Sequence, residues 1–123
     1  MVSRQLLSPG NVFDVFIIYE GDYSQVANFI DTLQPPDIAQ FAHRLEVLNT
    51  VGIPHNEEQF RNEGDEIFAL KTKNSRFYGF FNGPKVFVLA VGFKKGSGRK
   101  VERRHHSRAL LLRSELSLEE GNK

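Results

Sequence analysis

The side chains of this chain that are best suited to chemistry are several cations and one phenol, spaced a few residues apart. They fall into two short stretches of the second half of the sequence. They are Lys71, Lys73, Arg76, Tyr78, Lys94 and Lys95. Guanidinium and ammonium groups bind phosphate oxygens, and an amine crowded by like charge, or a phenol, can exchange a proton with a substrate. These residue types therefore indicate chemistry on a phosphate group.

The charge of the whole chain is divided unevenly between its parts. Residues 1–70 hold 3 Lys/Arg against 11 Asp/Glu, whereas residues 71–113 hold 12 Lys/Arg against Glu102 alone, within a formal net charge of +1. A basic block of this size attracts polyanions at long range, and nucleic acid is the commonest polyanion. The alternative is a solvated basic face beside a solvated acidic one.

Length and composition exclude several classes of protein. A chain of 123 residues fits a single domain, expected over 1–123. The absence of cysteine excludes disulfides, thiolate zinc sites and cysteine nucleophiles. No zinc-binding spacing, Rossmann fingerprint or phosphate-binding glycine loop is present, so we expect neither a metal nor a cofactor. Without a signal peptide or a membrane-spanning apolar run, we expect a cytoplasmic protein.

Hydrophobic periodicity predicts an α+β domain with the order β-α-α-β-β-β-α, in which an antiparallel meander and a basic final helix end the fold. Two helices are expected to begin near Asp22, as a cap, and near Pro35. The strands are expected over 12–19, 66–72, 76–81 and 85–93, the last of them central, and the final helix over 101–116. Residues 53–65 are expected to form a loop, and residues 1–11 and 117–123 are expected to be loose.

The turns between the last three strands would decide which side chains share a face. If 82–83 and 74–75 are two-residue turns, Arg76 faces Leu89 on one side and Lys73 on the other. A cationic cluster with a phenol then lies on one side of the sheet, formed by Lys71, Lys73, Arg76 and Tyr78. Like charges opposite one another are destabilising, a cost expected where an anion binds. A three-residue turn would break this cluster, and lysines can also simply blunt a sheet edge.

The final helix carries a second basic set, expected to contact RNA phosphates. Its members are Arg99, Lys100, Arg103, Arg104, His106 and Arg108. Acidic partners three or four residues away are nearly absent, and Glu102 alone cannot neutralise this set. The alternative is an ordinary solvated helix face.

Several segments resemble the phage-derived RelE/HigB-like toxins of bacterial type II toxin–antitoxin systems. The segments are FDVFIIYE (13–20), NFIDTL (28–33), LEVLNTVGIP (45–54), IFALK (67–71) and RFYGFFNGPKVFVLAVGFKK (76–95). The resemblance implies a compact α+β fold with the element order given above. It also implies an endoribonuclease that inhibits translation by cutting mRNA, in many members on the ribosome. Its partner would be a helix-turn-helix or ribbon-type antitoxin that covers the basic face.

The resemblance extends to individual positions. The family's basic positions are matched here by Lys71, Arg76, Lys94 and Lys95. Family members often have a second basic residue where this chain has Tyr78, and a histidine where it has Val91.

The chemistry we expect is metal-independent attack of a 2′-hydroxyl on the neighbouring phosphate of RNA. The expected roles are base for Lys71, Lys73 or Tyr78, clamp of the phosphorane for Arg76, and acid or electrostatic support for Lys94 or Lys95. A splayed base could stack on Phe80 or Phe87. Two alternatives remain: a catalytically impaired relative that only binds RNA or antitoxin, and a ParE-like gyrase poison.

Overall fold

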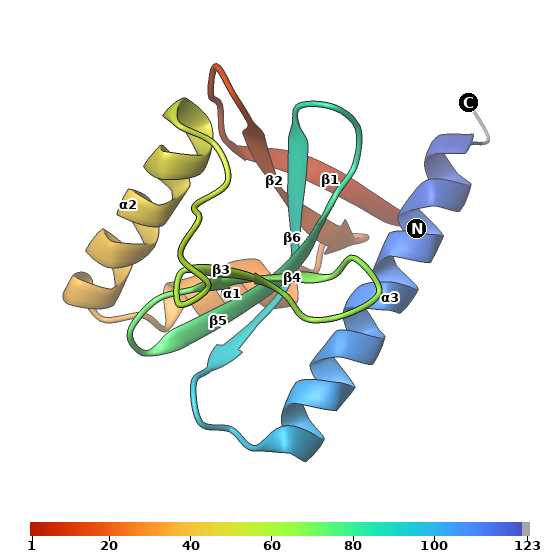
Figure 1. The fold of residues 1–123 in the computed structure, drawn as a ribbon. Helices are drawn as coiled ribbons and strands as arrows, with labels where there is room; N and C mark the ends of the chain where they lie inside the picture. Colours follow the sequence, from red (N-terminus) through yellow and green to blue (C-terminus); the bar gives the residue numbers. More distant parts are fainter. Residues whose placement is uncertain (122–123) are drawn as a thin grey trace.

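One twisted sheet with helices on both faces organises the molecule (Figure 1). The computed structural model describes residues 1–121, and within them it has a six-stranded mixed sheet and three helices, so the fold class is α+β. The elements in chain order are β1 (Val2–Ser8), β2 (Asp14–Glu20), α1 (Gln25–Asp31), α2 (Pro35–Thr50), β3 (Phe60–Asn62), β4 (Phe68–Lys71), β5 (Ser75–Phe81), β6 (Val86–Lys94) and α3 (Arg99–Gly121).

The strands lie in the order β1-β2-β6-β5-β4-β3. Every neighbouring pair is antiparallel except β2 and β6, which run parallel with Asp14 opposite Val86. Strand β6 is buried along nearly its whole length, as its apolar sequence predicts for a strand with partners on both sides.

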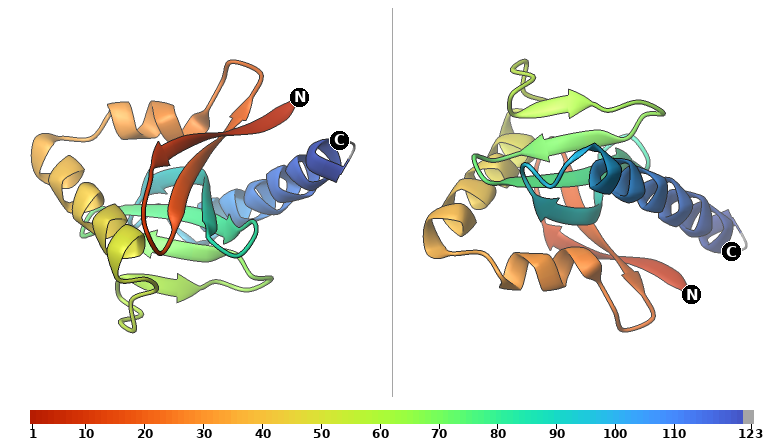
Figure 2. Two further views of the ribbon diagram at one scale, coloured as in Figure 1. Left: turned by 90° about the horizontal axis from the view of Figure 1, so that it is seen from above. Right: turned by 90° about the horizontal axis from the view of Figure 1, so that it is seen from below.

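Alternating side chains divide the core into two layers, one on each face of the sheet. On one face, Phe77 and Phe87 pack with Phe41 and Leu48 of α2. The other face packs against α3, and its core includes Ile18, Phe80, Val88, Leu112 and Leu116. Figure 2 shows α2 and α3 on opposite sides of the sheet. Burial of each such side chain contributes roughly 1.5–3 kcal/mol relative to exposure.

The N-terminal segment corrects the first expectation. The sequence predicts loose residues over 1–11, but residues 2–8 form β1, which pairs with β2 from Val2 opposite Glu20 onward. The guanidinium of Arg4 lies 4.4 Å from the ring centroid of Phe16. This cation–π contact adds a side-chain interaction between β1 and β2 to their backbone pairing. Tertiary pairing, rather than local alternation, makes this segment a strand.

Helix boundaries differ from the predictions at two ends. Helix α1 begins after Ser24, whose Oγ accepts a hydrogen bond from the Ala27 amide at 3.1 Å, and not after Asp22. The backbones of Glu20 and Tyr23 bond to each other and so keep Tyr23 outside the helix. Helix α3 continues to Gly121, so residues 117–121 are helical rather than loose. Residues 122–123 lie outside the described part of the chain.

The predicted loop over 53–65 contains a further short strand, β3, which pairs with β4 from Phe60 opposite Leu70. Phe60 is buried and contacts the rings of Phe68 and Phe87. A three-residue strand carries no periodic signal of its own, and its one apolar residue is fixed by packing across the sheet.

The registers of the last three strands also differ from the prediction. Arg76 lies opposite Lys71 and Phe93, and not opposite Lys73 and Leu89. Strand β6 starts later than predicted because Pro84, lacking an amide hydrogen, lengthens the turn, and an irregularity beside Tyr78 shifts the pairing once more. The alternation of side chains between the two faces is still as predicted for β4 and β5. Lys71, Arg76 and Tyr78 therefore belong to the same side of the sheet.

Candidate functional site

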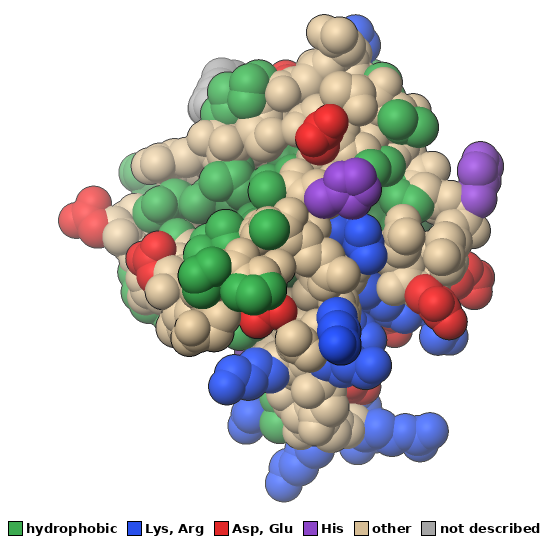
Figure 3. All heavy atoms as spheres, turned by 90° about the vertical axis from the view of Figure 1, so that its left-hand side faces the viewer, with side chains coloured by type: hydrophobic (Ala, Val, Ile, Leu, Met, Phe, Trp, Pro, Cys, Tyr) green, Lys and Arg blue, Asp and Glu red, His purple; other side chains and the backbone are tan. Residues whose placement is uncertain are grey.

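A hollow at one end of the sheet brings together cations from five parts of the chain. It has a volume of about 370 Å³ and lies between α2, the loop before β3, the β4–β5 turn and the residue after β6. We call it the cation hollow, lined by Gln40, Arg44, Asn56, Glu58, Gln59, Lys71, Thr72, Lys73, Arg76 and Lys95. Figure 3 looks at the molecule from the α2 side and shows lysine and arginine side chains gathering over its lower half.

Four of the six predicted catalytic residues line the cation hollow. They are Lys71, Lys73, Arg76 and Lys95. They come from the end of β4, the β4–β5 turn, the start of β5 and the residue after β6, so strand pairing is what brings them together. Five cations with one carboxylate, Glu58, make a net positive concavity suited to a phosphate.

Arg76 is held in place by the turn that precedes it. Its Nη1 donates to the backbone oxygens of Thr72 at 2.8 Å and Ser75 at 2.9 Å. The same turn is closed by the Thr72 amide bonding the Ser75 oxygen, and by the Ser75 amide bonding the Thr72 hydroxyl. One nitrogen of Arg76 is therefore committed to the protein, and the others are available to a ligand.

The structure adds residues to this hollow that the sequence analysis does not contain. Arg44 of α2 donates from Nε to the Lys71 oxygen at 2.9 Å, and Gln40 accepts a bond from the Lys73 amide at 2.6 Å. A signal for Arg44 exists in the sequence, because it follows Phe41 by three residues and precedes Leu48 by four. That spacing places it at the border of the buried stripe of the helix.

Tyr78 lies outside the cation hollow. Its side chain is 5% exposed, stacks edge-on against Phe93, and lines a separate space of about 350 Å³. We call this space the tyrosine hollow, lined by Glu63, Tyr78, Arg99, Glu102, Arg103 and His106. Burial, followed by the nearby carboxylates of Glu63 and Glu102, raises the pKa of Tyr78 to about 12. A phenol with that pKa is a poor base near neutral pH.

Lys94 also lies outside the cation hollow. It lines a neighbouring hollow between β6 and the start of α2, which shares Lys95 with the cation hollow. The predicted catalytic set is thus divided among three hollows.

The predicted RNA-contacting set on α3 is divided as well. Arg99, Arg103 and His106 face the tyrosine hollow. Arg104 and Arg108 line an apolar hollow on the other side of the helix, while Lys100 is exposed at its start. Arg108 has an acidic partner outside its own helix, because its Nη2 forms an ion pair with Glu20 of β2. This partner lies far away in the sequence, so helical spacing could not reveal it.

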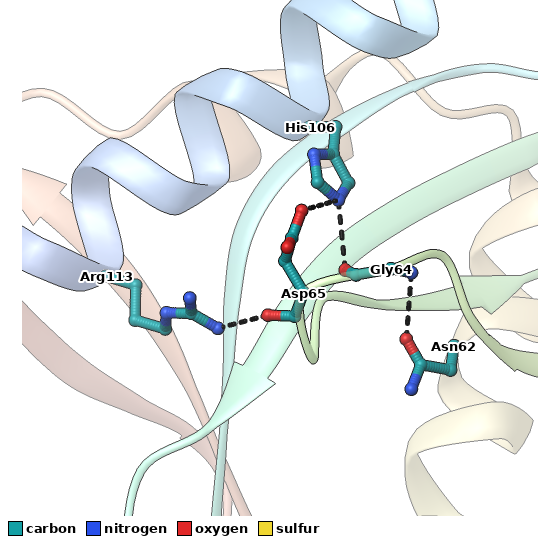
Figure 4. Close-up of polar contacts among 5 residues, drawn as sticks. All are labelled: Asn62, Gly64, Asp65, His106 and Arg113. Carbon is teal, nitrogen blue, oxygen red and sulfur yellow. Dashed lines mark hydrogen bonds and ion pairs between the residues drawn. The ribbon is translucent and has the colours of Figure 1, made fainter.

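His106 and Arg113 hold the loop between β3 and β4 against α3 (Figure 4). The His106 Nε2 lies 3.0 Å from the Gly64 oxygen and 3.8 Å from the Asp65 carboxylate. Arg113 Nη1 donates to the Asp65 oxygen at 2.7 Å, and the Gly64 amide bonds the Asn62 side chain. His106 is therefore engaged with the protein rather than free at the surface.

The two aromatic residues predicted to stack on a base, and His105 of α3, are structural. Phe80 and Phe87 are 1% and 0% exposed, so they cannot stack on a splayed base. His105 stacks on Phe93 with ring centroids 4.5 Å apart, and burial, with the Arg104 charge, lowers the pKa of His105. Within residues 1–121, no three histidine, aspartate or glutamate side chains gather as metal ligands. No helix in the same range has the length and apolar character needed to span a bilayer.

No protein-family model matches this chain, and no curated protein matches it.

Proposed function

We propose that this protein is a RelE/HigB-like toxin of a type II toxin–antitoxin system that cleaves mRNA, with the cation hollow as its active site. The observation that carries the proposal is the convergence of five cations in one concave space. They come from α2, β4, the β4–β5 turn, β5 and the residue after β6. An element order of β2-α1-α2-β4-β5-β6-α3, with β1 and β3 in addition, supports the same proposal, since the resemblance implies this order.

The chemistry is attack of a 2′-hydroxyl oxygen on the adjacent phosphorus. A bond forms between the 2′-oxygen and phosphorus, and the bond from phosphorus to the 5′-oxygen breaks. The 2′-hydroxyl proton passes to a base, and an acid protonates the leaving 5′-oxygen. The products are a 2′,3′-cyclic phosphate and a 5′-hydroxyl end, and no metal or oxidant is consumed.

The cation hollow contains a group for each of these roles. The free nitrogens of Arg76 and the ammonium of Lys95 can stabilise the crowded phosphorane. Lys71, Lys73 and the carboxylate of Glu58 can exchange the two protons. We no longer assign the base to Tyr78, because its hydroxyl belongs to another hollow and stays protonated at neutral pH.

The partners follow from charge. The basic part of the chain is suited to mRNA on the ribosome, where the phosphate backbone supplies most of the attraction. A cognate antitoxin, expected to be of the helix-turn-helix type, would neutralise the toxin by covering the same basic face.

The test is cleavage of an mRNA during cell-free translation, with new ends mapped by primer extension. The wild-type protein is expected to create new ends. A 2′-deoxy nucleotide at the cut site should abolish cleavage, because the nucleophile is missing. Lys73→Ala is expected to lower the cleavage rate by about 10²-fold, the lower end of the effect of removing a proton-transfer group.

The matched control is Lys85→Ala, an exposed lysine at the opposite end of β6. Lys73→Ala keeps its backbone bond to Gln40, so a loss of cleavage without a change in melting temperature reports on the side chain. The proposal is wrong if no new ends arise at a protein concentration that saturates the ribosomes, or if Lys73→Ala cuts as fast as Lys85→Ala.

A second candidate function is a protein that holds RNA or an antitoxin without cleaving it. One observation favours it: the burial of Tyr78 leaves the cation hollow without the phenol that the sequence had offered as a base. Such a protein would protect RNA from added nuclease while leaving no new ends in the same experiment.

A further inference from the structure

The hollow beside the cation hollow has features of a second anion site. Its volume is about 420 Å³, and it lies between the start of α2, the β4–β5 turn and the end of β6. We call it the Lys94 hollow, and its charged and polar lining includes Asp37, Asn74, Ser75, Lys94 and Lys95. It adjoins the cation hollow, because Lys95 belongs to the lining of both.

Ser75 is the most informative residue of the Lys94 hollow. It is 1% exposed, and its hydroxyl is the one buried side-chain oxygen or nitrogen in residues 1–121 without a hydrogen-bond partner. Leaving a buried hydroxyl unpaired is unfavourable, and nearly all such groups in folded proteins are satisfied. The oxygen itself is covered in this structure, so an acceptor bound in the hollow that Ser75 lines would complete it only after a small movement of the wall.

The charges around Ser75 indicate what that acceptor is. Lys94 is directly opposite Ser75 in the β5–β6 pairing, and Lys95 follows it, with its amide bonded to the Asn74 oxygen at 3.0 Å. One carboxylate is present, that of Asp37, and its Oδ1 accepts a bond from the Asn74 side chain at 2.9 Å. Two lysines against one carboxylate favour an anion with several acceptor oxygens.

The position of the hollow identifies the class of anion. Lys95 lines both hollows, so the two share a wall. We propose that the Lys94 hollow binds the phosphate of the nucleotide next to the one held in the cation hollow. The RNA backbone then crosses Lys95, and Lys94 anchors substrate rather than taking part in the chemistry. This inference rests on the proposed function for the identity of the ligand as RNA.

The test measures binding of 2′-O-methyl oligonucleotides, which lack the nucleophile and are not cut. A dinucleotide with one bridging phosphate and a trinucleotide with two are compared by fluorescence anisotropy at several salt concentrations. For the wild type, the second phosphate is expected to raise affinity about tenfold and to steepen the salt dependence by about 0.7 in log–log slope. Lys94→Ala should lose this gain and bind the dinucleotide as before.

Ser75→Ala gives a sharper test, because a structural role and a binding role predict opposite outcomes. Removing an unpaired buried hydroxyl should leave the melting temperature unchanged or raise it, while the gain from the second phosphate falls. Asp37→Asn should increase that gain by removing the one opposing charge. Lys85→Ala, at the far end of β6, is the charge-matched control and should behave as the wild type.

The outcomes separate this inference from the proposed function. If wild type and Lys94→Ala show the same gain from the second phosphate, the Lys94 hollow is not a phosphate site, whether or not the protein cuts RNA. If Lys94→Ala and Ser75→Ala lose the gain but no RNA is cut in translation, the site stands and the nuclease proposal fails. Equal gain in Ser75→Ala and the wild type would also overturn the role given to the hydroxyl.

Discussion

Burial of Tyr78 at the wall of the tyrosine hollow changes the pH at which this side chain ionises. Its pKa of about 12 lies above the ordinary value of 10, so the folded protein favours the neutral phenol more than the unfolded chain does. This contribution to stability is fully present below pH 10. It is lost as pH rises from 10 to about 12, by about 1.4 kcal/mol per pH unit.

We therefore predict two results for Tyr78→Phe. Its free energy of unfolding should fall less steeply than that of the wild type between pH 10 and pH 12, as measured by chemical denaturation. Its cleavage rate at pH 7 should remain within about threefold of the wild type, whereas removal of a true general base costs about 10²–10⁴-fold. Tyr23→Phe is the matched control, because that ring is 52% exposed. A large loss of cleavage activity in a Tyr78→Phe variant that remains folded would contradict this prediction and would show that Tyr78 takes part in catalysis.

At individual residues, the sequence predicted four of the cations that line the cation hollow but not their neighbours. The alternation of side chains along β4 and β5 was enough to place Lys71 and Arg76 on the same face, even though the predicted turn was one residue away from the observed one. Arg44 and Glu58 were missed because they reach the hollow from a helix and a loop, whose positions depend on packing of the whole chain.

The loop between β3 and β4 contains the two strained residues of the described backbone. Asp65 and Glu66 have φ angles of 56° and 60°, a left-handed conformation that costs non-glycine residues about 1–2 kcal/mol each. The contacts of this loop with His106 and Arg113 of α3 offset part of that cost. The conformation of the loop between β3 and β4 is thus stabilised by contacts with α3 rather than by the preferences of its own residues.

We predict that Glu66→Gly raises the free energy of unfolding by about 0.5–1 kcal/mol, because glycine adopts this conformation without strain. The exposed Glu66 side chain makes no hydrogen bond or ion pair among the described residues, so little else is lost. Glu57→Gly, at an exposed loop position with negative φ, should instead be neutral or destabilising. If Glu66→Gly destabilises the protein as much as Glu57→Gly does, strain is not stored in this loop.

Among the helices and strands, the long segments with a clear hydrophobic period were predictable from the sequence. The short strands that form only by pairing with distant segments were not. Helix α2, with Pro35 at its first position and a buried stripe through Phe41 and Leu48, follows from local signals. Strands β1 and β3 do not, because their identity depends on partners that lie elsewhere in the chain. The register of β5 on β6 was wrong because the turn at Pro84 is longer than predicted, and because a bulge beside Tyr78, which has no signature in a single sequence, shifts the pairing once more.

On the scale of the whole molecule, only some of the cations in the basic part of the sequence form a basic surface without acidic partners. Arg108 is neutralised by Glu20 of the acidic half. Arg103, by contrast, is exposed beside the tyrosine hollow. Attraction of RNA should therefore come from a subset of the cations.

We predict different effects for two arginines of α3. Arg103→Ala should weaken RNA binding and reduce the log–log salt slope by about 0.7, the value for one phosphate contact on a single strand. Arg108→Ala should leave that slope unchanged and lower the free energy of unfolding by less than about 1 kcal/mol, through loss of a partly exposed ion pair. Titration of single-stranded RNA at four or five salt concentrations measures both slopes. Identical slopes in the two variants would show that the ion pair does not set which arginine meets RNA.

The parallel pairing of β2 with β6 has a consequence for how the protein is made. Asp14 pairs with Val86, so the N-terminal hairpin of β1 and β2 has no partner until most of the chain has been synthesised. Pairings between such distant segments form late and slow the folding of a domain. A nascent or truncated chain that ends before β6 carries Lys71, Lys73 and Arg76 on an incomplete sheet and lacks Lys95, which directly follows β6. The full phosphate-sized concavity exists only in an almost finished polypeptide.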